Sequence, residues 1–351
     1  MKRLSLVFLG VFAFGISAYS SDAEDAEKAY DAKQYVKSFN IFTKLCNNGN
    51  IRGCNMLGLQ YESGDGVRQD NSKAVVLYSK ACDGGDGDGC SNLATMYLVG
   101  KGVKQNKAYA SELSTKACDF GDGRGCYRIG SNYLEGNIVN EDYAKALSYL
   151  TKSCDTGNGS GCNSLAVMYA DGLGVVEDKQ VAVNLYSKAC DAGVSIACTN
   201  LGVMYNQGTA VIEDKSHAVK LFKMACDDDD AYGCDKLGIA YAEGEGVKQD
   251  RAIAVKLFTK SCDGGDNEGC FNLGVMYENG WGIKQDKAKG NTFYEKSCNQ
   301  GYGHGCDTLG VNYGKGIGAK QNMVKAKALF GKACDLHYEN GCRNYAIVNS
   351  K

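Results

Sequence analysis

The chain has 351 residues, with 39 Lys and Arg against 41 Asp and Glu, and it contains 46 Gly, 18 Cys and no Pro. The nearly balanced charge, without a basic cluster, argues against a nucleic-acid-binding protein. A chain of this length is longer than a domain with a single globular core usually is. We therefore expect several domains or a repeat architecture.

The N-terminus is predicted to be a signal peptide, residues 1–20. Residues 1–3 form a short basic segment. Residues 4–16 form an apolar run that is too short for a transmembrane helix. Ala18 and Ser20 are the small residues expected before cleavage after Ser20. No other segment is apolar enough to span a bilayer. We therefore expect a secreted or periplasmic protein, in which an even number of regularly spaced cysteines indicates disulfides.

From Cys46 onward the cysteines come in pairs eight residues apart, and each pair follows the previous one by 36 residues. The register does not slip across nine copies. Residues 21–351 are therefore predicted to form a single solenoid domain rather than a set of unrelated domains. The spacing differs from the CxxC of zinc sites, and the chain has only three His. Neither a metal nor another cofactor is expected.

Each copy contains two amphipathic segments. In the second copy the first segment runs to Cys82 and the second starts near Cys90, each with apolar residues at the spacing of one helix face. Asp or Asn stands four residues before the first apolar residue of the first segment in the copies from Asp70 to Asn322, where it can cap a helix. Gly ends the second segment in the copies from Gly64 to Gly316, which is typical of a left-handed C-cap. The predicted fold is all-α.

The eight-residue spacing constrains how the cysteines can bond. Residues eight apart in one helix lie about 12 Å apart, whereas a disulfide needs Cα atoms about 4.4–6.8 Å apart. If each pair bonds within its repeat, the Gly- and Asp-rich segment between the cysteines must reverse the chain, and the disulfide staples an αα-hairpin. The alternative joins the second Cys of one copy to the first Cys of the next. We expect the first arrangement: Cys46–Cys54, Cys82–Cys90, Cys118–Cys126, Cys154–Cys162, Cys190–Cys198, Cys226–Cys234, Cys262–Cys270, Cys298–Cys306 and Cys334–Cys342.

The repeat carries the motif A-x-x-L-Y-x-K-A-C-x-x-G-x-x-x-G-C-x-N-L-G-x-M-Y-x-x-G-x-G-V, best seen at residues 182–211 and 254–283. It resembles the Sel-like repeat, a relative of the tetratricopeptide repeat. One disulfide per repeat behind a signal peptide is similar to the Helicobacter cysteine-rich protein family. The resemblance covers residues 26–351 and implies an α/α solenoid superhelix of nine disulfide-stapled hairpins.

The same resemblance implies a β-lactamase or penicillin-binding activity, because proteins of that family commonly carry this label. A serine β-lactamase needs the SxxK, SDN and KTG elements, and none of them occurs in the chain. His217, His304 and His337 are too scattered for a catalytic zinc site. No catalytic residue is therefore assigned.

Candidate partner contacts come from positions that vary among the copies. Trp281 is the only Trp, and it shares a turn position with Leu173 and Ile317. An exposed aromatic residue there could anchor a partner. The first segments also vary away from their apolar stripes, and the candidates there are Val75, Glu112, Lys220, Lys256, Asn291 and Lys327.

Three hypotheses for function follow. Because related repeats line a concave face with their first helices, we expect a scaffold that binds a protein or peptide outside the cytoplasm. The second hypothesis is a β-lactamase, with a β-lactam or cell-wall-like ligand. The third is a passive extracellular structural protein.

Four other features are expected to be structural. Lys stands two residues before the first Cys in eight of nine copies, where it can complement a helix dipole. The run from Asp227 to Asp230 is expected to be a solvated turn rather than a cation site. The Tyr column from Tyr61 to Tyr313 is expected to belong to the core, and His304 to be exposed.

Overall fold

The computed structural model describes residues 10–350, with side chains from residue 21 onward. The predicted signal peptide therefore lies outside the part whose side chains are described. The described chain forms 19 helices. In order they are α1 Gly10–Asp31, α2 Tyr35–Asn47, α3 Ile51–Ser63, α4 Asn71–Asp83, α5 Gly87–Val99, α6 Lys107–Asp119, α7 Gly123–Glu135, α8 Tyr143–Asp155, α9 Gly159–Asp171, α10 Lys179–Asp191, α11 Ser195–Gln207, α12 Lys215–Asp227, α13 Ala231–Glu243, α14 Arg251–Asp263, α15 Asn267–Asn279, α16 Lys287–Asn299, α17 Gly303–Lys315, α18 Met323–Asp335 and α19 Glu339–Asn349.

The helices alternate as the repeat predicts, and the all-α solenoid of 36-residue hairpins is confirmed. The even-numbered helices α2 to α18 are the first helices of the repeats, and the odd-numbered helices α3 to α19 are the second helices. The predicted caps are also present. The Asp70 side chain, for example, accepts a hydrogen bond from the Lys73 amide at the start of α4. Gly64 ends α3 with φ +86°, a left-handed conformation that favours Gly.

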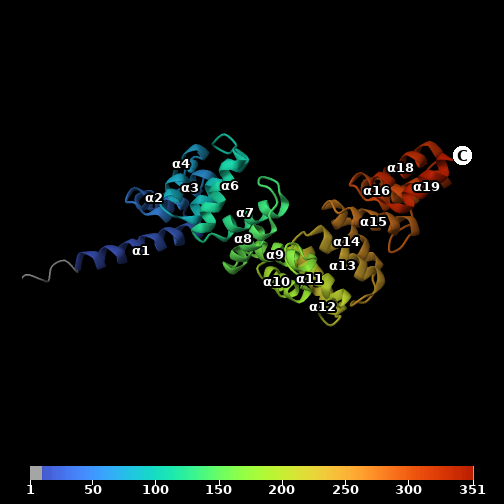
Figure 1. The fold of residues 1–351 in the computed structure, drawn as a ribbon, viewed down its shortest axis with the longest axis horizontal. Helices are drawn as coiled ribbons and strands as arrows, with labels where there is room; N and C mark the ends of the chain where they lie inside the picture. The colour runs from blue at the N-terminus through green and yellow to red at the C-terminus, as the bar shows by residue number, and fades with distance from the viewer. Residues whose placement is uncertain (1–9, 351) are drawn as a thin grey trace, which may run out of the picture. The chain divides into compact units, whose positions relative to one another are not determined.

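The chain divides into two compact units, residues 1–176 with α1 to α9 and residues 177–351 with α10 to α19. Within each unit consecutive helices lie side by side (Figure 1).

Helix α1 precedes the first repeat and packs against it. Ala26 and Ala29 are buried, and the Tyr30 hydroxyl donates a hydrogen bond to the Asp65 carboxylate over 2.9 Å. Burial and the Asp65 carboxylate together raise the pKa of Tyr30 to about 12. The repeat motif does not include this helix, so the periodic pattern of the sequence does not predict it.

Nine disulfides join the two cysteines of each repeat, with Cα atoms 4.4–4.7 Å apart. Each one ties the last turn of a first helix to the first turn of a second helix. The first eight pairs are buried, whereas Cys334 and Cys342 of the last repeat are half-exposed. The disulfides therefore hold together the two helices of one hairpin.

Successive hairpins contact each other in a different way. An aromatic ring of one first helix packs against a Gly in the preceding second helix, and we call this Gly position the Gly notch. Gly58 of α3 faces the ring of Tyr78 in α4, and a Cβ atom added to Gly58 would lie 2.7 Å from that ring. Gly238 faces Phe258 in the same way, at 2.6 Å. The full set of such pairs with an aromatic ring is Gly58–Tyr78, Gly202–Phe222, Gly238–Phe258, Gly274–Tyr294 and Gly310–Phe330. The Gly in the middle of these second helices is thus explained by the close approach of the next first helix.

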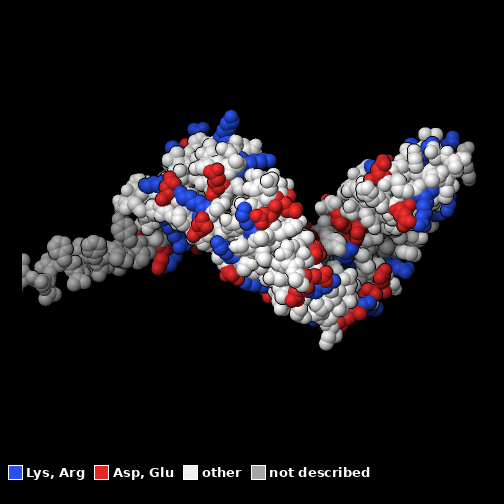
Figure 2. Space-filling model, viewed as in Figure 1, with Lys and Arg blue, Asp and Glu red and all other residues white. Residues whose placement is uncertain are grey.

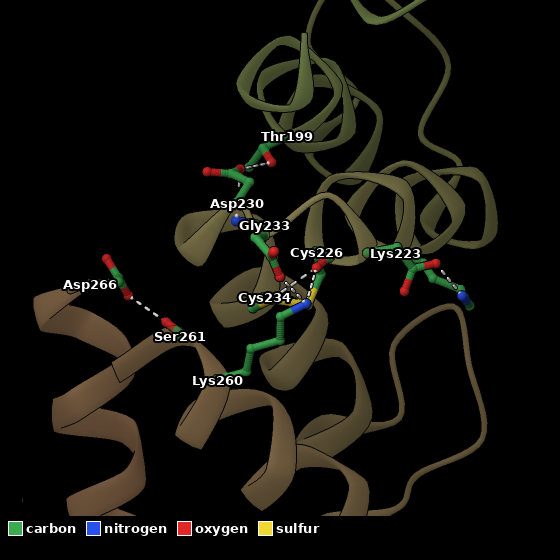
Figure 3. The surroundings of a disulfide bond; sticks show 11 residues. Thr199, Lys223, Cys226, Asp230, Gly233, Cys234, Lys260, Ser261 and Asp266 are labelled. Atoms are coloured by element: carbon green, nitrogen blue, oxygen red, sulfur yellow. Dashed lines mark hydrogen bonds and ion pairs between the residues drawn. A yellow bond between two sulfur atoms is a disulfide. The ribbon is translucent and has the colours of Figure 1, made fainter. Parts of the chain in front are cut away.

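The Lys that stands two residues before the first Cys of most repeats links neighbouring hairpins. The Lys260 ammonium donates to the carbonyl oxygen of Cys226 over 2.6 Å (Figure 3). It also lies 2.8 Å from the Asp229 carboxylate. Lys80 reaches the Cys46 carbonyl in the same way, at 3.0 Å. These Lys therefore complement a helix C-terminus, as expected, but the helix belongs to the preceding repeat.

Candidate binding surfaces

One position of the first helices faces solvent in every repeat. It is the sixth residue after the N-cap, and we call these residues the first-helix row: Asn40, Val76, Glu112, Ser148, Asn184, Lys220, Lys256, Thr292 and Ala328. All nine are exposed, and Val76 has 67% of its surface accessible. Three of the predicted contacts, Glu112, Lys220 and Lys256, lie in this row. The row combines a fixed place in the fold with variable chemistry.

The other three predicted first-helix contacts lie one residue earlier, and the structure places them differently. Val75 is half-buried against the core around Tyr78. Asn291 is only 6% exposed; it donates to the Ile317 carbonyl over 2.7 Å and accepts from Asn312 over 2.8 Å. Lys327 is half-buried, with its ammonium 6.0 Å from the centre of the Tyr345 ring.

A step of one residue rotates a side chain by about 100° around a helix. That rotation turns this column away from the solvent-facing row and into contacts with neighbouring helices. Asn291 is therefore corrected from a candidate contact to a buried link between α16 and α17.

Trp281 lines a cavity in the second unit. It has 41% of its surface exposed, and the Arg251 guanidinium lies 4.8 Å from the centre of its ring. The cavity has a volume of about 480 Å³ and is also lined by Ile239, Ala242 and Val275 of the second helices. The Arg251 guanidinium thus covers part of the Trp281 ring, and the cavity beside the ring has apolar walls together with polar ones, which include Glu243 and Asn272. The role of Trp281 as a partner contact stays a prediction.

The two residues that share the turn position of Trp281 are less accessible. Leu173 is half-buried and belongs to the first unit, whereas Ile317 is half-buried and belongs to the second. The Ile317 carbonyl is engaged by Asn291. The equivalent residue Lys101 pairs with Glu62 over 2.9 Å, so this position mainly links neighbouring repeats.

The Tyr column of the second helices is half-buried from Tyr61 to Tyr313 rather than fully part of the core. Several of these rings lie beneath a side chain of the next first helix. The Lys289 ammonium is 5.4 Å from the centre of the Tyr277 ring, and Lys325 is 5.0 Å from Tyr313. Cation–π contacts of this kind join the column to the surface of the first helices.

Polar side chains on successive second helices form links that the sequence analysis missed. The Asn92 amide donates to the Asn55 side chain over 2.9 Å, although the two residues are 37 positions apart. Asn272 donates to Asp235 over 2.7 Å, and the Lys236 ammonium lies 3.1 Å from the same carboxylate. Burial of Asp235, whose side chain is inaccessible to solvent, raises its pKa. The one sequence signal for these links is the spacing of the polar residues, 37 positions, which is one residue more than a repeat.

The acidic run from Asp227 to Asp230 forms the turn after α12, and three of its four carboxylates have partners in the protein. Asp227 pairs with Lys223 over 2.5 Å, and Asp229 with Lys260 over 2.8 Å. Asp230 caps α13 by accepting from the Gly233 amide, and it also accepts from the Thr199 hydroxyl over 2.5 Å (Figure 3). Among the described residues there is no group of three or more His, Cys, Asp and Glu arranged to hold a metal ion.

His304 is half-buried, contrary to the sequence-based expectation, because it packs within a cluster of aromatic rings. Its ring centre lies 4.3 Å from that of Phe271 and 5.1 Å from that of Tyr338. Burial lowers the pKa of His304, and the nearby Asp307 carboxylate opposes this effect. The cluster joins three consecutive repeats near the end of the second unit.

We expect His304 to make stability depend on pH. Since its pKa is lower in the folded protein, the unfolded chain binds more protons as the pH falls below the ordinary His value of about 6.5. The free energy of unfolding should therefore fall from pH 7.5 to pH 5. The variant His304→Gln should show a smaller fall in urea titrations at the two pH values. His337→Asn, at an exposed turn position, is the control and should keep the wild-type pH dependence; an unchanged dependence in His304→Gln would contradict the assignment.

Across residues 10–350, no helix has both the length and the apolar character needed to cross a membrane. The nine disulfides are typical of proteins in an oxidising compartment outside the cytoplasm.

Comparison with known proteins gives a family-level match over most of the chain. The Sel1 repeat profile matches residues 51–86, 87–122, 123–158, 159–194, 195–230, 231–266, 267–302 and 308–338. The first seven matched stretches each start with a second helix and include the first helix of the next repeat. This is the pair of helices joined by the Gly notches described above.

Individual relatives either match a smaller part of the chain or match a larger part at lower sequence identity. HcpE of Helicobacter pylori strain 26695, which carries a provisional beta-lactamase name, is 37% identical over 76 residues, or 20% of this chain. The chain spans about a fifth of the length of that curated relative.

Two solved structures are also similar. A Sel1 repeat protein from Oxalobacter formigenes has a TM-score of 0.64 at 26% identity, covering 69% of this chain and 99% of that one. Cysteine rich protein B of Helicobacter pylori has a TM-score of 0.32 at 29% identity, covering 38% of this chain and 97% of that one.

Proposed function

Since this chain belongs to the Sel1 repeat family, we propose that it is a binding scaffold that holds a protein or peptide on the exposed faces of its first helices. We further propose that it works in the periplasm or outside the cell, after removal of the signal peptide near Ser20. The disulfides support an oxidising compartment, because they would be reduced in most cytoplasms.

The observation that carries the proposal is the first-helix row. Its members are exposed in all nine repeats, yet they include apolar, acidic, basic and small polar residues. A position in the core would be restricted to apolar residues, so the row belongs to the surface of the solenoid. A rigid frame that presents one variable residue per repeat suits recognition of an extended partner.

The proposal can be tested with two sets of alanine substitutions in the second unit. The row variant carries Asn184→Ala, Lys220→Ala, Lys256→Ala and Thr292→Ala. The control variant changes three exposed residues at the ends of second helices: Gln207→Ala, Asn279→Ala and Lys315→Ala. A partner captured from envelope or extracellular material by the oxidised wild type should be lost from the row variant and kept by the control. Capture that survives in both variants would place binding elsewhere, and no specific partner would favour a passive structural protein.

A β-lactam-directed activity is the second candidate, and the name of HcpE is the finding that favours it. It can be measured by nitrocefin turnover and fluorescent-penicillin labelling of the purified protein, oxidised and reduced in parallel. Turnover that disappears on reduction would place an active site on the stapled fold. An oxidised protein that neither hydrolyses nitrocefin nor becomes labelled would reject this candidate.

A further inference from the structure

We propose that the first-helix face of the second unit binds an acidic segment of a partner protein. This inference rests on the proposed function and names the chemistry of the partner. Lys residues lie on one stripe of the first helices, and several of them form no ion pair with a described residue. Acidic residues are absent from that stripe.

Positive charge is concentrated on one stripe of these helices. The third, sixth and tenth residues after each N-cap lie within an arc of about 60°. We call this stripe in α10, α12, α14, α16 and α18 the basic face: Val181, Asn184, Lys188, His217, Lys220, Met224, Ile253, Lys256, Lys260, Lys289, Thr292, Lys296, Lys325, Ala328 and Lys332. It holds eight Lys and no Asp or Glu, although the whole chain has 41 Asp and Glu against 39 Lys and Arg.

Most acidic residues of these helices lie at the helix ends; Glu295, in the interior of α16, is the exception and lies outside the basic face. Asp250 and Asp286 cap the starts of α14 and α16 by accepting backbone hydrogen bonds. Asp263, at the end of α14, lies 3.4 Å from Lys296 of the next first helix. In the view of Figure 2, acidic and basic side chains are interspersed. The segregation is therefore by position along the first helices.

Lys residues at the tenth position already interact with the preceding repeat. Lys260 and Lys296 donate to carbonyl oxygens of Cys226 and Cys262, over 2.6 and 3.0 Å. Lys332 donates to the Asn299 side chain over 2.9 Å. Their charge is partly used inside the fold, so they are not the main groups available to a ligand.

Four other Lys residues of the basic face are available. Lys220, Lys256, Lys289 and Lys325 are exposed, and none forms an ion pair with a described residue. They come from four consecutive first helices, α12 to α18. Lys289 and Lys325 also lie over half-buried Tyr rings, which adds aromatic surface beside the charge.

This arrangement fits carboxylates presented in series along a protein segment. Each repeat offers one ammonium group, a point charge that can accept a carboxylate in several orientations. A nucleic-acid backbone would require a denser array of cations, usually with Arg. A series of single charges on a rigid frame therefore favours an Asp- and Glu-rich segment, with electrostatic steering of its approach.

The test uses the oxidised full chain and fluorescein-labelled poly-L-glutamate, with binding followed by fluorescence anisotropy at low salt. The double variant Lys220→Glu/Lys256→Glu is compared with Lys248→Glu/Lys284→Glu, which makes the same charge change at exposed turn positions. We expect the first variant to raise the Kd at least about tenfold and the second to change it less than about twofold. Binding should also weaken as the salt concentration rises.

Three results would overturn the inference: no binding of poly-L-glutamate by the wild type, equal loss in both variants, or tighter binding of heparin or single-stranded DNA than of poly-L-glutamate. The proposed function is judged separately by the alanine variants described above. Capture of a partner without acidic segments through the first-helix row would support the scaffold and reject this inference.

Discussion

Reduction of all nine disulfides is expected to unfold the protein at 37 °C, whereas the oxidised protein should keep its helices. Each disulfide closes a short loop, and the chain-entropy account assigns about 2.5 kcal/mol to a loop of this length. The contributions of nine such bonds are not simply additive. Together they are still comparable to the total stability of a typical domain, about 5–15 kcal/mol. The change can be followed by far-UV circular dichroism after treatment with dithiothreitol and alkylation.

A single pair provides the matched experiment. Cys226→Ala/Cys234→Ala removes a buried disulfide from the second unit, and it should lower the free energy of unfolding by about 2.5 kcal/mol in urea. Oxidised protein incubated and alkylated without reductant is the control for the chemical treatment. A fully reduced protein with wild-type helical content and a wild-type urea midpoint would show that helix packing alone maintains the fold.

Gly310→Ala is expected to destabilise the protein by about 1–3 kcal/mol, the usual cost of overpacking a core. A Cβ atom at position 310 would lie 2.7 Å from the ring of Phe330, so α17 and α18 would have to move apart. This result would be opposite to the usual effect of Gly→Ala in a helix, which is a gain of up to about 1 kcal/mol. The urea midpoints of the variant and the wild type provide the comparison.

The same helix contains the control. Gly314 is one turn further along α17, and a Cβ atom there would make only an ordinary contact, 3.7 Å from Ala326. Gly314→Ala should therefore stabilise the protein slightly. If both variants were stabilised to the same extent, the Gly notch would not be the reason for Gly at position 310.

The repeat made most of the fold predictable. Asp70 and Gly64 each mark a helix boundary through a local rule that holds in almost every copy, so the sequence was sufficient to place the helices. The reversal between Cys226 and Cys234 followed from the distance that a disulfide can span. Helix α1 was missed because it lacks the repeat motif, and nothing in the periodic pattern indicates that it packs on the first repeat.

The candidate surface was only partly predictable. Variation among copies marked both Lys220 and Asn291, because a column can vary either for recognition or because each repeat contacts a different neighbour. Only the structure separates exposed Lys220 from Asn291, which bonds to Asn312. Similarly, His304 has no local sequence signal for burial, since Phe271 and Tyr338 come from other repeats.

The central claim is that the first helices bind the partner, and affinity measurements on a captured partner test it most directly. Its Kd should be measured for the oxidised wild type, for the row variant at Asn184, Lys220, Lys256 and Thr292, and for the second-helix variant. The account predicts a Kd raised at least about tenfold in the row variant and changed less than about twofold in the second-helix variant. A partner that binds the row variant as tightly as the wild type would contradict it.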